Sequence, residues 1–170
     1  MLLLTAKMTQ VISNFGIMDR KKIVVLSGSG ISAESGISTF RGGNGLWDNE
    51  PIEEVATIEG WYRNPERVLR FYNERRAQLK TVKPNEAHII LAEMEKDFEV
   101  CVITQNVDDL HERAGSTDII HLHGELTKVR PEDTYSEMDR WSERYVKDIG
   151  YEPVHIGDKG GPHNTQLRPH

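Results

Sequence analysis

The chain has a single cysteine, Cys101, among its 170 residues. A disulfide framework and a zinc site built from thiolates are therefore both excluded within one chain. Cys101 lies in an apolar run, where we expect it to behave as a small buried hydrophobic residue. Positive charge is also in short supply: the formal net charge is −6. This balance argues against non-specific binding to nucleic acid.

Long apolar runs are missing as well, and none reaches the length that a membrane-spanning helix needs. The chain starts with a short apolar stretch but has no cleavage region, so we interpret residues 1–20 as a disordered extension rather than a signal peptide. The hydrophobic content of 37% and charged content of 28% are typical of a globular domain. We therefore expect one cytoplasmic domain, without membrane or nucleic-acid partners.

The stretch around residues 23–36 organises the chain. Residues 23–26 are apolar and mostly β-branched, which predicts a strand buried on both faces. Gly28 and Gly30 follow at once, and glycine permits positive φ and close approach of another molecule to the backbone. A helix that begins near residue 31, with Ser32 as a candidate N-cap, would favour an anion. A tight turn without a ligand has the same pattern, because the third glycine of the G-x-G-x-x-G fingerprint is missing.

A second buried strand is predicted over residues 98–104, and it ends in Gln105, Asn106 and Asp108. Open α/β sheets bind ligands at the carboxyl ends of their parallel strands, so these polar side chains are candidate ligand contacts. The alternative is structural: Asn106 or Asp108 could cap a helix that Gly115 terminates.

A third short strand and a turn are predicted over residues 118–124, with His121 and His123 two positions apart. Such residues point to the same side of a strand, and imidazole is a common metal ligand. No cysteine and no obvious carboxylate set completes a site, so we expect no metal here.

A helix is predicted to start at Asn64 and Pro65, and it carries Tyr72 and Arg75 three positions apart on one face. A phenol beside a guanidinium can hold a carboxylate. Alternatively, Tyr72 packs in the core while Arg75 and Arg76 are solvated. A further helix follows, in which His88 is expected to pack or cap rather than to catalyse.

Two of these motifs together resemble a known family. Residues 28–32 with Phe40, Arg41 and Gly42 resemble the signature of the sirtuins, the NAD-dependent protein-lysine deacylases, although Ser29 replaces the usual alanine and Ser38 the usual proline. Residues 105–108 match the family's Q-N-I-D element, with valine for isoleucine. The resemblance covers residues 21–170 and stops near the middle of a sirtuin, before the strands that hold the adenosine half of NAD.

The resemblance implies an α/β fold: a partial Rossmann-like parallel sheet of the deoxyhypusine synthase-like NAD-binding type. Residues 21–42 and 84–124 would form this sheet with its helices. A helical module would occupy residues 43–83, and a cysteine-free remnant of the family's zinc module would occupy residues 125–165. No zinc is expected. The glycine-containing turn at residues 43–47 would be a lid over a ligand or a simple surface loop.

The resemblance also implies NAD as co-substrate and acylated lysines of proteins as substrate. His123 would be the catalytic base, a task that suits imidazole, and Asn106 would act with it. Ala56, Tyr72 and Arg75 match the subgroup that removes succinyl and malonyl as well as acetyl groups, yielding nicotinamide and O-acyl-ADP-ribose. The implied NAD-binding residues are Gly28, Ser29, Gly30, Ile31, Ser32, Phe40, Arg41, Gln105, Asn106 and Asp108.

Two other functions stay open. A chain without the later strands leaves a sheet edge and apolar faces uncovered, so it could be a catalytically incomplete fragment that binds a partner or associates with itself. The third possibility is an NAD glycohydrolase with water as acceptor, which would have no use for an acyl pocket at Tyr72 and Arg75.

Overall fold

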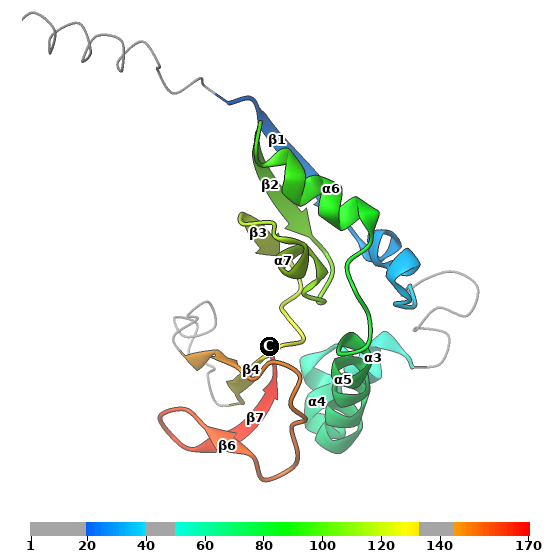
Figure 1. The fold of residues 1–170 in the computed structure, drawn as a ribbon. Helices are drawn as coiled ribbons and strands as arrows, with labels where there is room; N and C mark the ends of the chain where they lie inside the picture. Colours follow the sequence, from blue (N-terminus) through cyan, green and yellow to red (C-terminus); the bar gives the residue numbers. More distant parts are fainter. Residues whose placement is uncertain (1–19, 40–49, 133–144) are drawn as a thin grey trace, which may run out of the picture.

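The computed structural model describes residues 20–39, 50–132 and 145–170 (Figure 1). The predictions for Phe40, Arg41, the turn at residues 43–47 and the N-terminal extension lie outside these ranges. The described chain has two parts: a parallel sheet with its helices, and a group of helices beside an antiparallel sheet (Figure 1). Within these ranges, no helix combines the length and the apolar character needed to cross a membrane.

The parallel sheet contains the three predicted strands, β1 (Lys22–Ser27), β2 (Glu99–Thr104) and β3 (Ile119–His121), in the order β1-β2-β3. The register pairs Ser27 with Thr104 at the carboxyl ends of β1 and β2. Because both strands end at the same level, the loops that follow them start side by side. The α/β class with a partial Rossmann-like sheet is therefore confirmed.

Two helices, α6 (Glu86–Met94) and α7 (Leu110–Ala114), cover one face of this sheet (Figure 1). His111 of α7 reaches Ser27 of β1, with 3.1 Å between Nε2 and Oγ, and its ring packs edge-on against His88 of α6. His88 is fully buried and forms a capping box with Asn85, as expected for a residue that packs and caps. Gly115 ends α7 with a left-handed φ of 108°, also as predicted.

The opposite face of the sheet is open, so the prediction that residues 23–26 are buried on both faces is wrong. Val24 and Leu26 are 66% and 69% exposed. Leu26, Ile103 and Ile120 lie in register on this face. Cys101, the register partner of Val24, is half-buried rather than buried. The physical reason is the missing layer: among the described residues, helices pack on one side of β1–β3 only.

The second part pairs α3 (Ile52–Val55), α4 (Ile58–Arg63) and α5 (Pro65–Leu79) with a four-stranded sheet. The sheet has the order β5-β4-β7-β6 and is antiparallel throughout. Its strands are β4 (Lys128–Pro131), β5 (Lys147–Asp148), β6 (Lys159–Gly160) and β7 (Thr165–Pro169). Apolar side chains from both layers form one core cluster, which consists of Trp61, Val68, Leu69, Val129, Val154 and Leu167.

Helix α5 carries a fully buried arginine. The helix begins as predicted, with the Asn64 side chain accepting a hydrogen bond from the Arg67 N–H and Pro65 in the first turn. Arg76 is 0% exposed, and its Nε donates to the Leu126 carbonyl at 2.6 Å while Nη1 donates to Asn73 Oδ1 at 2.9 Å. Burial lowers the pKa of Arg76 to about 10. The alternative of a solvated Arg76 is therefore wrong, because this side chain joins α5 to the segment before β4.

Replacing Arg76→Met is expected to lower the free energy of unfolding by about 2–3 kcal/mol, because the Leu126 carbonyl and Asn73 lose a charged donor in a buried place. Urea unfolding of both proteins measures the change. Arg70→Met is the matched control: Arg70 is exposed on the same helix, so its loss should change stability by no more than about 0.5 kcal/mol. Equal losses for the two variants would contradict this structural role of Arg76.

Candidate active site

The loop after β1 forms a short 3-10 helix, η1 (Ser29–Ser35), and Ser32 is not its N-cap. The N-cap position is Gly28, which is extended (φ −146°), and no side chain caps the helix. Neither Gly28 nor Gly30 uses the positive φ that glycine permits. A Cβ added at either glycine would meet no atom within 4 Å. The glycines therefore border open space, which leaves room for a ligand against the backbone.

Ser32 instead joins the two loops at the carboxyl edge of the sheet. Its hydroxyl is fully buried, donates to Asp108 Oδ2 at 2.9 Å and accepts from Asn106 Nδ2 at 3.0 Å. Burial raises the pKa of the Asp108 carboxyl, while the hydrogen bonds from Ser32 and the Leu110 N–H oppose that rise. Asn106 Oδ1 is buried and has no hydrogen-bond partner. This oxygen is an acceptor that a bound ligand could satisfy.

A cavity of about 690 Å³ opens beside these loops, a size typical of small-molecule sites. It contains eight residues that the sequence had indicated: Ser29, Gly30, Ala56, Tyr72, Arg75, Gln105, Asn106 and His123. Sequence reasoning had missed the other five, which are Thr39, Ile52, Phe71, Val107 and Leu126. Val107 and Phe71 could have been found from the sequence, because each lies next to a residue that a motif indicated. Nothing in the sequence marked Leu126, which reaches the cavity from the segment after β3.

Ile31 and Asp108 support the loop rather than line this cavity. The Ile31 carbonyl accepts a hydrogen bond from Asn85 Nδ2 at 2.7 Å. The N-cap position of α7 is Asp109 and no side chain caps this helix, so the alternative that Asn106 or Asp108 caps it is wrong. Asp108 instead accepts a hydrogen bond from the Leu110 N–H at 3.2 Å, within the turn that enters α7. It also borders a small neighbouring cavity of about 30 Å³. Direct contacts of Ile31 and Asp108 with NAD stay a prediction.

Tyr72 and Arg75 face the cavity from α5. The Arg75 side chain is only 15% exposed, and burial lowers the pKa of its guanidinium. Nη1 donates to the Phe71 carbonyl at 2.7 Å and the nearest carboxylate oxygen, on Glu74, is 3.8 Å away, while Nε is buried without a hydrogen-bond partner. Burial also raises the pKa of Tyr72, although the positive charges of the neighbouring arginines act to lower it. Its phenol is therefore protonated. This pair is therefore placed to receive an anion.

His123 lies beyond the end of β3, so the prediction that it shares a strand face with His121 is wrong. The chain turns at Gly124 as predicted, where φ is 78° and an added Cβ would collide with the carbonyl oxygen of His170. His123 is exposed, and it lines both the main cavity and a second one of about 240 Å³. Ala56 and Tyr72 also line both. His123 thus stands at the junction of the two cavities.

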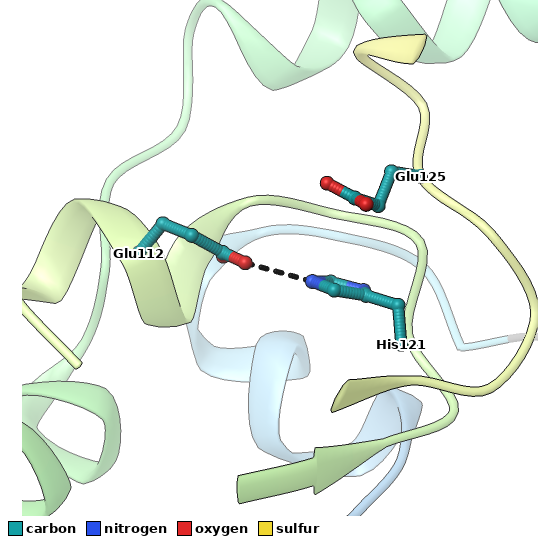
Figure 2. Close-up of side chains that lie close together, drawn as sticks. All are labelled: Glu112, His121 and Glu125. Atoms are coloured by element: carbon teal, nitrogen blue, oxygen red, sulfur yellow. Dashed lines mark hydrogen bonds and ion pairs between the residues drawn. The ribbon is translucent and has the colours of Figure 1, made fainter. Parts of the chain in front are cut away.

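His121 points toward two glutamates (Figure 2). Ligand atoms of Glu112, His121 and Glu125 all lie within 4.8 Å of one another. The expectation that no carboxylates accompany His121 is therefore wrong: Glu112 comes from α7, nine positions earlier in the chain, and Glu125 from the segment directly after β3. One Glu125 oxygen lies 2.6 Å from Lys128 Nζ, so this carboxylate already has a cationic partner. The absence of a bound metal stays a prediction.

A parallel sheet with a glycine-containing loop and a cavity at its carboxyl edge is typical of the class of nucleotide-binding α/β proteins. Residues 28–159 match the model of the Sir2 family. The chain belongs to this family, the sirtuins, and the predicted resemblance is confirmed.

Curated relatives are similar over most of this chain. It is 58% identical over 151 residues to an NAD-dependent protein deacylase of Bacteroides thetaiotaomicron and 54% identical over 149 residues to one of Helicobacter pylori. Each match covers 88% of the chain but only 62% and 61% of the relative. The chain therefore spans about three fifths of the length of these relatives.

Solved structures of the family have the same fold. A mutant Sir2 homologue in complex with ADP-ribose superposes with a TM-score of 0.76 at 39% identity, covering 89% of this chain and 58% of that one. A Sir2 homologue in complex with NAD gives a TM-score of 0.70 at 39% identity, covering 89% and 56%. A Sir2 mutant with a deacetylated peptide and 3′-O-acetyl-ADP-ribose gives 0.67 at 30% identity, covering 89% and 59%.

Proposed function

We propose that this chain carries the catalytic centre of an NAD-dependent protein-lysine deacylase that acts on succinyl, malonyl and acetyl groups. The observation that carries the proposal is one cavity lined by the phosphate-loop residues Ser29 and Gly30, by Asn106, by His123 and by the pair Tyr72 and Arg75. Similarity to relatives that are NAD-dependent protein deacylases supports it. We also propose that the chain acts in the cytoplasm.

The residues present fit NAD. The open space in front of Gly28 and Gly30 leaves room for a diphosphate against the backbone. The unpartnered Asn106 Oδ1 and the exposed Gln105 offer polar contacts for the nicotinamide end. NAD supplies an ADP-ribosyl group that accepts the acyl group as nicotinamide leaves. The substrate-binding residues of this chain would hold the two reactants at the junction of the cavities.

His123 is proposed as the general base. An exposed imidazole can exchange its proton with solvent, and histidine is the side chain that most often acts as a general base, which suits removal of a proton from a ribose hydroxyl. The second cavity, lined by Trp61, Val68 and Pro169 among others, would admit the acylated lysine from the side of β7. His123 would then face the acyl group and the ribose together.

The preference for acidic acyl groups rests on Arg75. A buried guanidinium whose Nε lacks an acceptor is costly, and a carboxylate at the end of a succinyl or malonyl chain would supply one. Tyr72 would add a neutral donor beside it. Ala56, a small residue that lines both cavities, would leave space beside this pair.

The first test is nicotinamide release by this chain with NAD and a succinyl-lysine peptide. We expect release that depends on the peptide and falls to background with the unmodified peptide. Release at the same rate without any peptide would instead identify an NAD glycohydrolase. No release from a folded sample would refute the proposed activity for this chain.

A second candidate function is self-association, favoured by the exposed apolar face of the parallel sheet. Val24, Leu26, Ile120 and Leu122 are each 48–69% exposed there. Apolar clusters of this kind mark interfaces. Sedimentation over a range of protein concentrations tests it: a catalytically incomplete self-assembling module would associate and would show no thermal stabilisation by NAD.

A further inference from the structure

His121 has two acceptors and therefore needs two protons. Its Nδ1 lies 2.8 Å from the backbone oxygen of Asn106, and its Nε2 lies 2.8 Å from Glu112 Oε1 (Figure 2). A carbonyl and a carboxylate accept hydrogen bonds and donate none, whereas a neutral imidazole has a single N–H. Both contacts are hydrogen bonds at once only when the ring is an imidazolium. The side chain is 8% exposed, so water does not replace either partner readily.

The charges around His121 agree with an imidazolium. Burial by itself lowers the pKa of His121, but the hydrogen bonds to Glu112 and to the Asn106 carbonyl, with the charges of Glu112 and Glu125, raise it above its ordinary value. Burial tends to raise the pKa of Glu112, yet the hydrogen bond from His121 leaves it lowered, so Glu112 is the carboxylate. Burial lowers the pKa of the neighbouring His111, which is therefore neutral and does not repel the ring.

The charges of the side chains around His121 favour an ion pair over a metal site. Two carboxylates, Glu112 and Glu125, face two cations, His121 and Lys128, whose Nζ lies 2.6 Å from Glu125. The cluster is neutral without a metal ion. Its two hydrogen bonds through His121 connect α7 to the loop after β2.

The far end of this connection is Asn106. Its backbone is held on both sides: the N–H donates to Thr104 Oγ1 at 3.0 Å and the carbonyl accepts from His121. Its side chain is held by one bond to Ser32, which leaves Oδ1 free within the cavity wall. We infer that His121, as an imidazolium bridging Glu112 and the Asn106 carbonyl, is the positioning residue that sets the orientation of Asn106 in the cavity. The inference rests on the proposed function only where it concerns NAD.

The bridge is tested by NMR titration of this chain, without substrate. The reporter is the amide of Val107, whose peptide bond contains the Asn106 carbonyl. We expect the His121 ring to titrate above 6.5 and the Val107 amide to shift with the same midpoint. Glu112→Gln should lower both midpoints by about one unit, because the ring loses its counter-charge. The control Glu93→Gln, exposed on α6, should change neither. A ring that titrates at or below 6.5, or a Val107 amide that does not follow it, overturns the bridge.

The effect on catalysis is tested by the pH dependence of kcat/KM for NAD. The wild type should lose activity on the alkaline side as His121 deprotonates. His121→Phe should be about tenfold slower at neutral pH and lack this alkaline limb, while His121→Gln, whose amide still donates to the Asn106 carbonyl, should retain more activity. An alkaline limb that persists in His121→Phe overturns the positioning role. If the wild type releases no nicotinamide, the proposed function fails, and the NMR titration still decides the bridge.

Discussion

Arg75→Met is expected to reduce desuccinylation about 100-fold while deacetylation changes by less than about threefold, since a charge-assisted hydrogen bond in a buried site is worth roughly 1.5–3 kcal/mol. Methionine keeps the apolar stem that packs near Phe71 but removes the guanidinium. An acetyl group has no carboxylate for Arg75 to bind. Only the turnover of the acidic substrates should therefore fall. Steady-state kinetics with succinyl- and acetyl-lysine peptides of the same sequence measure the ratio.

Arg70→Met is the matched control, because Arg70 is exposed on the same helix and lines none of the cavities described above. It should leave both activities unchanged. Tyr72→Phe removes a neutral donor only, and about tenfold loss of desuccinylation is expected. Equal losses of the two activities in Arg75→Met would refute the acyl-carboxylate contact and leave Arg75 a structural residue.

His123→Ala is expected to lower peptide-dependent turnover by about 100- to 10,000-fold, the range that a positioned general base supplies. The side chain is exposed, so the free energy of unfolding should change by less than about 0.5 kcal/mol. Single-turnover assays with NAD and acylated peptide, together with urea unfolding, separate the two effects.

His163→Ala provides the comparison for this loss. His163 is also exposed, on the turn between β6 and β7, and it lines none of the cavities described above. Its removal should leave turnover and stability unchanged. Turnover that survives in His123→Ala would place the base elsewhere, and a loss matched by His163→Ala would point to a general effect of removing a surface imidazole.

Sequence reasoning was most successful for features that depend on residues close together along the chain. Apolar runs bounded by glycine and polar residues predicted all three strands of the parallel sheet, and Asn64 with Pro65 predicted the start of α5. Helical spacing was enough to place Tyr72 and Arg75 on one face. These features depend on neighbours a few residues apart, and such neighbours are visible in a linear sequence.

Burial and charge pairing were predicted less well. Val24 and Leu26 belong to a strand pattern typical of a buried sheet, yet their exposure depends on whether a second layer covers them. Sequence reasoning allowed Arg76 to be a solvated helix residue. In the structure its Nε donates to the Leu126 carbonyl, which is 50 positions away along the chain. No local pattern reports such a partner.

The sequence by itself determined the class of sheet, the positions of its strands along the chain, the family and most of the residues that line the cavity, because motifs fix backbone conformation locally. Only the tertiary structure decided that Ser32 joins Asp108 and Asn106, that His123 stands between two cavities, and that His121 meets Glu112 instead of His123. The physical reason is that hydrogen bonds and ion pairs act over about 3 Å in space, whatever the distance along the chain.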